Sequence, residues 1–294
     1  MNGIIVINKN SGPTSHDIIN KVRKIFKTKK VGHLGTLDPL ASGVLVVCIN
    51  DATKLVQFLE NDSKEYIAEV LVGTSTDTFD CTGNIINDEE VNDLTNQKID
   101  ETLKNFLGKS KQLPPIYSAI KKDGKKLYEY AREGKDVEIA EREIEIYNIE
   151  RISDVKIDNN KALFSIKVNV SKGTYIRSLC VDICKKLGYS GCMNNLIRTR
   201  SGKWSITDSS TIEEVEYGNY TLYSMLDAVS DFPFLEDEEC IYKAKHGMKI
   251  SANNVSNLIG NNRKTIVIKE LDKIVAVYEY DEAIKGYRAL RVWN

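Results

Sequence analysis

Several short stretches of the chain carry the hydrophobic pattern of β-strands. Residues 3–7 and 43–49 are continuous apolar runs, and residues 65–72 form a third run rich in branched apolar side chains. Two longer stretches, 137–149 and 162–170, are charged and β-branched, which is typical of strands with one face in water. We therefore expect a sheet built mainly from these five segments.

Other segments carry the 3.6-residue period of helices. After a turn at residues 10–13, Thr14 or Ser15 is expected to cap a helix whose apolar face consists of Ile18, Ile19, Val22, Ile25 and Phe26. Further helices are expected at residues 52–59, 98–107, 127–133 and 174–187. Gly188 follows the last of these and is expected to end it.

The order of these elements indicates the fold class. Strands and helices do not alternate regularly as in a doubly wound sheet, so we expect an α+β fold with a largely antiparallel mixed sheet flanked by helices. An acidic stretch at residues 213–239 resembles a domain boundary, and three strand-like runs follow it, at 264–269, 274–280 and 287–293. We expect a large domain, residues 1–230, and a small all-β domain, residues 231–294.

The net charge of the chain says little about its function, whereas the distribution of charged residues along the chain says more. The chain has 41 Lys plus Arg against 42 Asp plus Glu, which does not by itself indicate a nucleic-acid partner. Six basic residues fall within residues 21–30 and four within 121–126, whereas 212–240 contains no Lys or Arg. This segregation suits a basic face that binds phosphates, and it equally suits ordinary solvated helices and loops.

Cysteine usage and the absence of long apolar runs predict a cytoplasmic protein. No apolar run approaches the roughly 20 residues that span a bilayer, and the first residues lack the basic region of a secretory signal. The six cysteines are then expected to be reduced thiols. Cys180, Cys184 and Cys192 could in principle bind zinc, but with only three histidines in the chain we favour buried helical thiols and expect no metal site.

The segment with the most chemistry-bearing residues is 31–43, Val-Gly-His-Leu-Gly-Thr-Leu-Asp-Pro-Leu-Ala-Ser-Gly. Glycines, His33 and the pair Asp38-Pro39 lie between a basic helix and a buried strand, a setting typical of a functional loop on a rigid scaffold. From the residues alone a structural interpretation is also open, because Asp before Pro commonly begins a turn and a loop histidine often binds a backbone carbonyl.

This segment resembles the signature Gly-His-x-Gly-x-Leu-Asp-Pro-x-Ala-x-Gly of bacterial tRNA pseudouridine-55 synthases, the TruB family of pseudouridine synthases. Further motifs of that family appear in the expected order at residues 9–15, 64–66 with 76–83, 114–121 with 124–132, 171–179 and 196–199. Asn10 departs from the first motif, which usually has proline there. The resemblance spans almost the whole of the large domain, and a weaker similarity relates the small domain, entered through residues 245–250, to a PUA-like RNA-binding extension.

The resemblance implies a pseudouridine synthase fold and the isomerisation of uridine 55 in the T loop of tRNA, without a cofactor. It also implies a stand-alone enzyme, with no guide RNA and no membrane partner, that is monomeric. Two alternatives stay open: an RNA-binding or RNA-folding protein without turnover, and a guide-dependent sister pseudouridine synthase that acts on other RNA.

Three residues are catalytic by this resemblance. Asp38 is the nucleophile that holds an intermediate while the base turns, and Arg177 keeps it ionised through a two-pronged pair. Tyr66 stacks on the extruded uracil and brings its hydroxyl near the proton that leaves C5. Without the resemblance, we would interpret Arg177 as a surface residue of a helix and Tyr66 as a tyrosine of the hydrophobic core.

Five more residues are substrate-binding by the same resemblance. His33 fills the space that the flipped base leaves. Tyr175 and Leu196 pack about the target nucleotide, while Lys9 and Asp80 make polar contacts at its edge. The alternative for Leu196 is a place in the hydrophobic core.

Overall fold

The computed structural model describes residues 1–59, 63–260 and 263–293. Its centre is a ten-stranded sheet whose main path runs β1 (Gly3–Lys9), β3 (Ser42–Ile49), β13 (Gly191–Ser201), β4 (Lys64–Val72), β12 (Lys161–Val170), β10 (Arg142–Arg151) and β7 (Gly108–Gln112). Three more strands pair outside this path: β2 (Val31–Leu34) with β3, β11 (Lys156–Asp158) with β12, and β14 (Trp204–Ser205) with β13.

All of these pairs are antiparallel except β13 with β3, in which Ile197 lies opposite Ser42 and Arg198 opposite Gly43. Two short hairpins complete the β structure of this part of the chain, β5 (Thr74–Thr76) with β6 (Ile85–Asp88), and β8 (Lys121–Lys122) with β9 (Lys125–Lys126). The expected largely antiparallel mixed sheet is confirmed.

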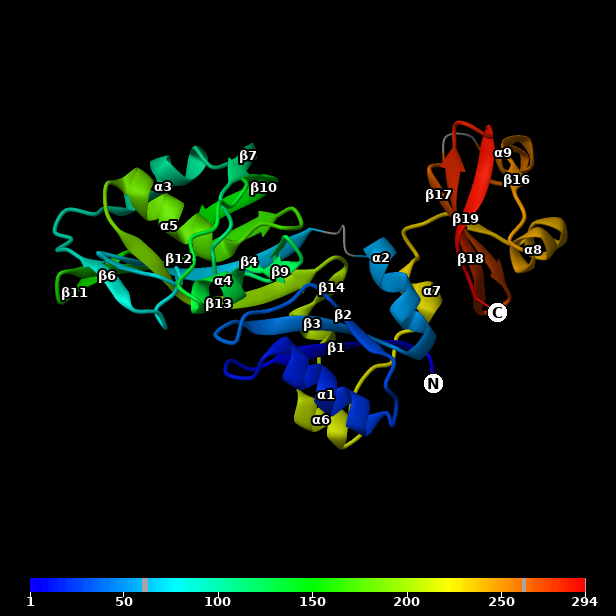
Figure 1. Ribbon diagram of the computed structural model, residues 1–294, viewed down its shortest axis with the longest axis horizontal. Coiled ribbons are helices and arrows are strands. Elements are labelled where there is room, and N and C mark those ends of the chain that lie inside the picture. Colours follow the sequence, from blue (N-terminus) through cyan, green and yellow to red (C-terminus); the bar gives the residue numbers. More distant parts are fainter. Residues whose placement is uncertain (60–62, 261–262, 294) are drawn as a thin grey trace.

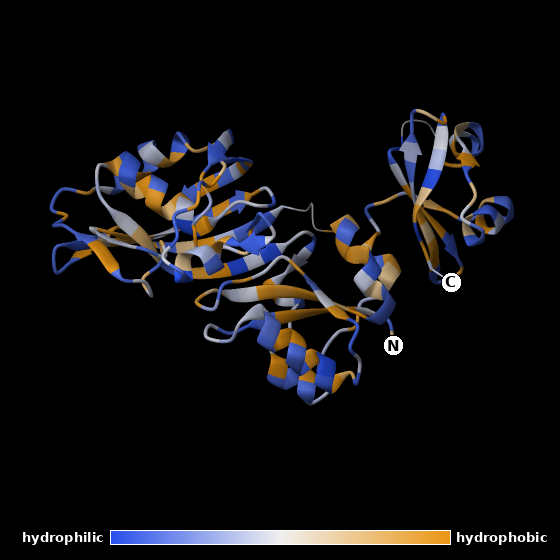
Figure 2. Ribbon diagram, viewed as in Figure 1, coloured by the Kyte–Doolittle hydropathy of each residue, from blue (hydrophilic) through white to orange (hydrophobic). Residues whose placement is uncertain are grey.

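Helices cover the sheet in two groups (Figure 1). Helices α3 (Asn96–Lys104) and α5 (Ile176–Leu187) pack on the part made by β13, β4 and β10, whereas α1 (Ser15–Ile25) and α6 (Ile212–Glu216) pack beside β1 and β2. Their apolar faces join one core that runs through both parts, and in Figure 2 hydrophobic and hydrophilic residues are interspersed along these helices. The shorter helical segments are η1 (Asn50–Leu55), α2 (Val56–Leu59), α4 (Leu127–Arg132), η2 (Ile206–Asp208) and α7 (Met225–Ala228).

The caps that the sequence predicted are present. Thr14 is the N-cap of α1, with its side chain accepting from the Asp17 backbone and the Asp17 carboxylate accepting from the Thr14 backbone. Gly188 ends α5 in the left-handed region, at φ 91°. The thiols of Cys180, Cys184 and Cys192 are buried and unbridged. The first two lie on α5 as expected, but Cys192 lies on β13, so the expectation of a helical thiol was wrong there.

The structure also contains elements that the sequence did not predict. Strand β13 lies in the middle of the sheet, between β3 and β4, although its sequence contains two asparagines and two arginines. Two bulges interrupt its pairing with β4, at residues 193–195 and 198–200. At each bulge the alternation of inward and outward side chains is broken, so the strand lacks a regular hydrophobic period of two residues. Helix α3 begins and ends earlier than expected, and β10 begins at Arg142 rather than at residue 137.

The C-terminal part is a five-stranded sheet in the order β15 (Phe234–Leu235), β17 (Thr265–Glu270), β18 (Lys273–Asp281), β19 (Gly286–Val292) and β16 (Ile250–Ser251). The three strands predicted there are confirmed, but helices α8 (Glu238–Lys245) and α9 (Ala252–Ile259) accompany them, so the all-β expectation omitted two helices. The boundary at residue 230 remains a prediction. No helix in the described ranges has the length and apolar character needed to cross a membrane.

Candidate active site

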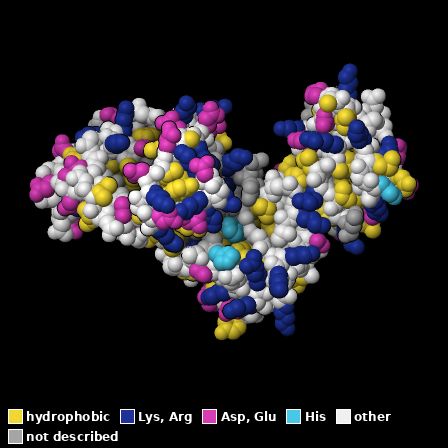
Figure 3. All heavy atoms as spheres, in the orientation of Figure 1, with side chains coloured by type: hydrophobic (Ala, Val, Ile, Leu, Met, Phe, Trp, Pro, Cys, Tyr) yellow, Lys and Arg dark blue, Asp and Glu magenta, His cyan; other side chains and the backbone are white. Residues whose placement is uncertain are grey.

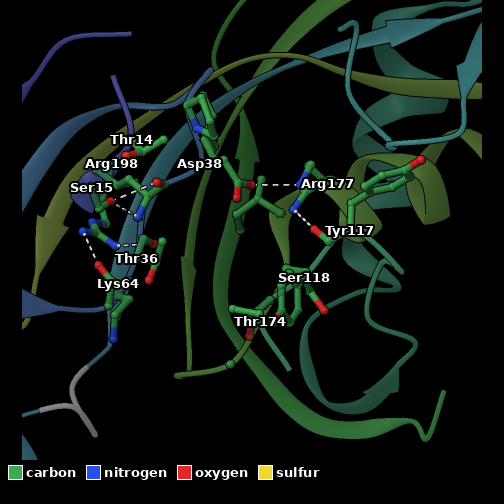
Figure 4. A pocket seen from close by; sticks show the side chains of 18 of the residues that line it. Thr14, Ser15, Thr36, Asp38, Lys64, Tyr117, Ser118, Thr174, Arg177 and Arg198 are labelled. Atoms are coloured by element: carbon green, nitrogen blue, oxygen red, sulfur yellow. Dashed lines mark hydrogen bonds and ion pairs between the residues drawn. The ribbon is translucent and has the colours of Figure 1, made fainter. Parts of the chain in front are cut away.

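A pocket of about 630 Å³ opens where the two parts of the large sheet meet. Its walls come from the segment between β2 and β3, the strands β4 and β13, the N-terminal ends of α1 and α5, and residues 117–119. Figure 3 shows histidine side chains near the centre of the molecule, with Lys and Arg side chains nearby. Figure 4 shows the side chains that line the pocket.

Asp38 and Arg177 meet in this pocket. Asp38 follows β2, and Arg177 lies in the first turn of α5. Oδ2 of Asp38 lies 2.9 Å from Nε of Arg177, and the Nε–H does not point along this contact, so it is an ion pair rather than an aligned hydrogen bond. The Asp38 side chain is 37% exposed, so one side of the carboxylate faces the pocket. Burial raises the pKa of Asp38, the Arg177 charge opposes this rise, and the Asp80 charge adds to it.

The Arg177 guanidinium is almost fully enclosed, with only 6% of the side chain exposed. Nη1 donates to the Thr78 carbonyl at 3.0 Å, and Nη2 donates to the Tyr117 carbonyl at 2.9 Å. Nη1 also lies 3.8 Å from Oδ2 of Asp80. The alternative of a surface arginine is therefore wrong for Arg177.

Asp80 and Lys9 lie behind the pocket and do not line it. Asp80 is 6% exposed, and its Oδ1 accepts from the Thr78 hydroxyl at 2.9 Å and from the Thr82 amide at 3.0 Å. Lys9 is fully buried, and its Nζ donates to the carbonyls of Asn10, Pro13 and Pro39. Burial lowers the pKa of Lys9 to about 8, which the Asp38 charge opposes.

The other predicted residues line the pocket. Tyr66 on β4 is 7% exposed and lies opposite Arg198 of β13. Tyr175 precedes α5, and burial raises the pKa of its hydroxyl. Leu196 is 5% exposed, while His33 lies on β2 with its pKa lowered, first by burial and then by the Arg198 charge.

Several pocket residues were not predicted to be functional, among them Ser15, Lys64 and Arg198. Arg198 is fully buried and donates only to carbonyls, those of Val44 at 2.7 Å, Gly35 at 3.0 Å and Thr36 at 3.5 Å. The described residues include no carboxylate within ion-pair distance of it. Its place in the motif at residues 196–199 was the available signal, but motif membership alone does not reveal a buried guanidinium.

The second of the two basic clusters lies partly at the pocket. Residues 121–126 form the β8–β9 hairpin, and Lys126 lines the pocket. Lys125 forms an ion pair with Glu133, and Lys122 lies 3.9 Å from Glu138, so part of this positive charge is balanced.

Comparison with known proteins agrees with this geometry. Residues 23–176 match the family model of the TruB family pseudouridylate synthase N-terminal domain. The tRNA pseudouridine synthase B of Streptococcus sanguinis is 44% identical over 301 residues, which covers 100% of both chains. That of Bacillus pumilus is 50% identical over 216 residues, 73% of this chain and 70% of the relative.

Solved structures support the fold. A chain in a structure described as an H/ACA RNP bound to a substrate RNA containing 2'-deoxyuridine has a TM-score of 0.72 and 25% identity, covering 99% of this chain and 85% of that one. A Cbf5-Nop10-Gar1 complex contains a chain that is 28% identical, also with a TM-score of 0.72, covering 99% and 84%. The family model covers more than half of this chain, and the full-length relatives share well over a third of its residues. The chain therefore belongs to the TruB family of pseudouridylate synthases.

Proposed function

We propose that this protein is a cytoplasmic tRNA pseudouridine synthase that converts uridine 55 in the T loop to pseudouridine, with Asp38 as the nucleophile. The observation that carries the proposal is the Asp38 carboxylate, which faces the pocket on one side and the buried Arg177 guanidinium on the other, 2.9 Å away. A carboxylate in this position is open to a substrate and is held ionised by a fixed cation.

The reaction has three requirements that the pocket can meet. The bond from ribose C1' to uracil N1 breaks, a bond from C1' to C5 forms, and the C5 proton leaves while N1 gains one, with no net redox change. Asp38 holds an intermediate while the base turns. Tyr66, on the pocket wall, stacks on the uracil and offers a hydroxyl near C5. No cofactor is required by this chemistry.

Reaching the target base requires flipping it out of the T loop, which costs on the order of a few kcal/mol. His33 lies at the pocket wall on β2, where it can fill the vacated position. Tyr175 and Leu196 supply apolar surface around the extruded nucleotide. Lys9 and Asp80 act from behind, because they hold the backbone near Asp38 and the guanidinium of Arg177 rather than the nucleotide.

We further propose that the enzyme works alone, as a monomer and without a guide RNA. The structural neighbours include proteins from H/ACA complexes, whereas the full-length relatives are named tRNA pseudouridine synthase B. Identity of 39–44% over whole chains in the second group, against 25–28% in the first, favours the stand-alone reaction on tRNA.

The test uses an unmodified tRNA transcript tritiated at C5 of its uridines, and no other RNA. The wild type is expected to release tritium, and a transcript with cytidine at position 55 is expected to release none. Asp38→Asn should bind the tRNA in a filter assay but release no tritium, while Asp158→Asn, an exposed aspartate of β11, should behave as wild type. Tight binding without release by the wild type would favour an RNA-binding protein without turnover, and release only after addition of a guide RNA would favour the guide-dependent alternative.

A further inference from the structure

The segment that carries Asp38, residues 35–39, has no regular secondary structure, yet each of its five carbonyls is bound. The backbone amides of Ala41 and Gly12 donate to the carbonyls of Asp38 and Pro39, at 3.1 and 2.8 Å. The other three carbonyls are bound by side chains that reach in from distant elements.

Arg198 binds the first two of these. From β13 its guanidinium donates to the carbonyls of Gly35 and Thr36, and its Nε donates to Val44 on β3. The fork is planar and always charged, so it fixes the direction of both carbonyls at once. Since no carboxylate among the described residues pairs with Arg198, its buried charge is satisfied mainly by this segment.

Ser15 binds the third of these carbonyls, which belongs to Leu37. Its hydroxyl donates to the Leu37 carbonyl and accepts from the Leu37 amide, both at 2.9 Å. Ser15 is the first residue of α1 and is 2% exposed. Leu37 directly precedes Asp38, so its peptide orientation determines where the carboxylate leaves the backbone. Figure 4 shows Ser15, Thr36 and Arg198 together on one side of Asp38, with Arg177 on the other.

We propose that Arg198 and Ser15 are positioning residues for the isomerisation, which together hold the backbone of residues 35–37 so that Asp38 presents its carboxylate at the correct place in the pocket. This inference rests on the proposed function. Neither residue acts on the uridine itself. Arg177 sets the charge and direction of the carboxylate, whereas Arg198 and Ser15 set the position of the backbone from which it projects.

The experiment measures tritium release from tRNA in single turnover with enzyme in excess, together with tRNA affinity and thermal unfolding. The variants are Arg198→Lys, which keeps the charge but loses the fork, Ser15→Ala, and the double variant. Arg200→Lys is the matched control, because Arg200 lies on the same strand but donates to Ser63 and Gly202.

A displacement of the nucleophile by about 1 Å can lower a rate roughly hundredfold, so we expect each single variant to react tenfold to hundredfold more slowly at saturating enzyme, with unchanged tRNA affinity. The double variant should be less impaired than the product of the two effects, because both act on one segment. Arg200→Lys should react at the wild-type rate.

Three outcomes would overturn the proposal. The first is wild-type rates in folded Arg198→Lys and Ser15→Ala. The second is a loss of rate that a higher enzyme concentration restores, which would assign the residues to RNA binding. The third is multiplicative effects in the double variant. If Arg198→Lys does not fold, Ser15→Ala alone decides between a slowed and an unchanged rate, and failure of the wild type to release tritium would refute the proposed function instead.

Discussion

Arg177 lies between two carboxylates, with its Nε 2.9 Å from Oδ2 of Asp38 and its Nη1 3.8 Å from Oδ2 of Asp80. The second carboxylate is shielded behind the pocket, whereas the first faces it. Asp80 therefore contacts the guanidinium from behind, and Asp38 is the one of these two carboxylates that is open to the pocket. The Thr78 and Tyr117 carbonyls fix the remaining arms of the fork.

Replacement of Arg177 by lysine should stop most turnover without preventing folding. The ammonium keeps the charge, but its single nitrogen cannot replace the three separate nitrogens with which the guanidinium contacts Asp38, Thr78 and Tyr117. We expect a loss of roughly 10²- to 10³-fold in the single-turnover rate. Removal of one hydrogen-bond donor from the oxyanion hole of other enzymes has an effect of this size. Filter binding of tRNA should remain close to that of the wild type. A rate within threefold of the wild type would show that charge alone is sufficient.

The rate should fall on acidification at a higher pH than an ordinary aspartate requires. Burial raises the pKa of Asp38 above its usual 3.8, and only the ionised form is a nucleophile. Between 3.8 and this raised pKa the folded protein binds more protons than the unfolded chain, so Asp38 adds stability as the pH falls there. Protonation of Asp38 therefore does not unfold the protein in this pH range, and the loss of rate has to come from the loss of the nucleophile.

Single-turnover rates measured from pH 4 to 8, with circular dichroism at each pH, check this prediction. The profile should show a one-proton limb above pH 3.8 while the fold persists. A rate that stays constant down to the lowest pH at which the protein is folded would contradict it.

Lys9 should produce an opposite limb at alkaline pH. Its pKa of about 8 in the folded protein compares with 10.5 for an ordinary lysine. Above pH 8 it loses one of the protons that bind the carbonyls near Asp38, and the rate should decline. Between pH 8 and 10.5 the unfolded chain binds more protons than the folded protein, so this group contributes stability that increases with pH.

The comparison is with Lys9→Met. This variant should be slower at neutral pH, because the Asn10, Pro13 and Pro39 carbonyls lose their buried donor. Its rate should show no decline through pH 8, and its stability between pH 8 and 10 should rise less than that of the wild type in denaturant titrations. An identical alkaline limb in both proteins would assign the limb to another group.

Gly43 should tolerate no side chain. Its φ is +98°, and a Cβ there would lie 2.2 Å from the Arg198 carbonyl, in the parallel pairing of β3 with β13. Gly43→Ala should lower the free energy of unfolding by about 3 kcal/mol, since strain and overlap combine. Gly108→Ala is the control, because its φ of +90° is similar but nothing lies within 4 Å of the added carbon. There we expect a loss of about 1 kcal/mol. Equal losses in urea titrations would exclude the overlap as the cause.

Sequence patterns predicted the parts of this fold whose signals are local. Strands β1, β3, β4 and β12 and helices α1 and α5 occur where the patterns predicted them, within a few residues, because each buries one face or both. The caps at Thr14 and Gly188 follow from side-chain and backbone chemistry within one turn. Family motifs in the sequence also selected Asp38, Tyr66 and Arg177 as site residues before their separation was known.

Other features depended on long-range contacts that no local pattern contains. Strand β13 is central because β3 and β4 supply its hydrogen-bond partners, although asparagine and arginine interrupt its apolar period. Lys9 and Asp80 carry charged side chains of the kind that often contact a substrate. Tertiary packing nevertheless places both behind the pocket.

The sequence by itself determined the family and the core helices and strands, and it selected the carboxylate that we propose as the nucleophile, because these depend on residue types at short spacing. Only the tertiary structure decided how that carboxylate is held. Arg198 comes from a strand some 160 residues after the Asp38 segment in the chain, and Ser15 comes from a helix 22 residues before Leu37. The Arg198 contacts form only when the sheet brings β3 and β13 together, and the Ser15 contact forms only when α1 packs beside β2. No local pattern contains either arrangement, since buried polar and charged groups are tolerated only where folding supplies their partners.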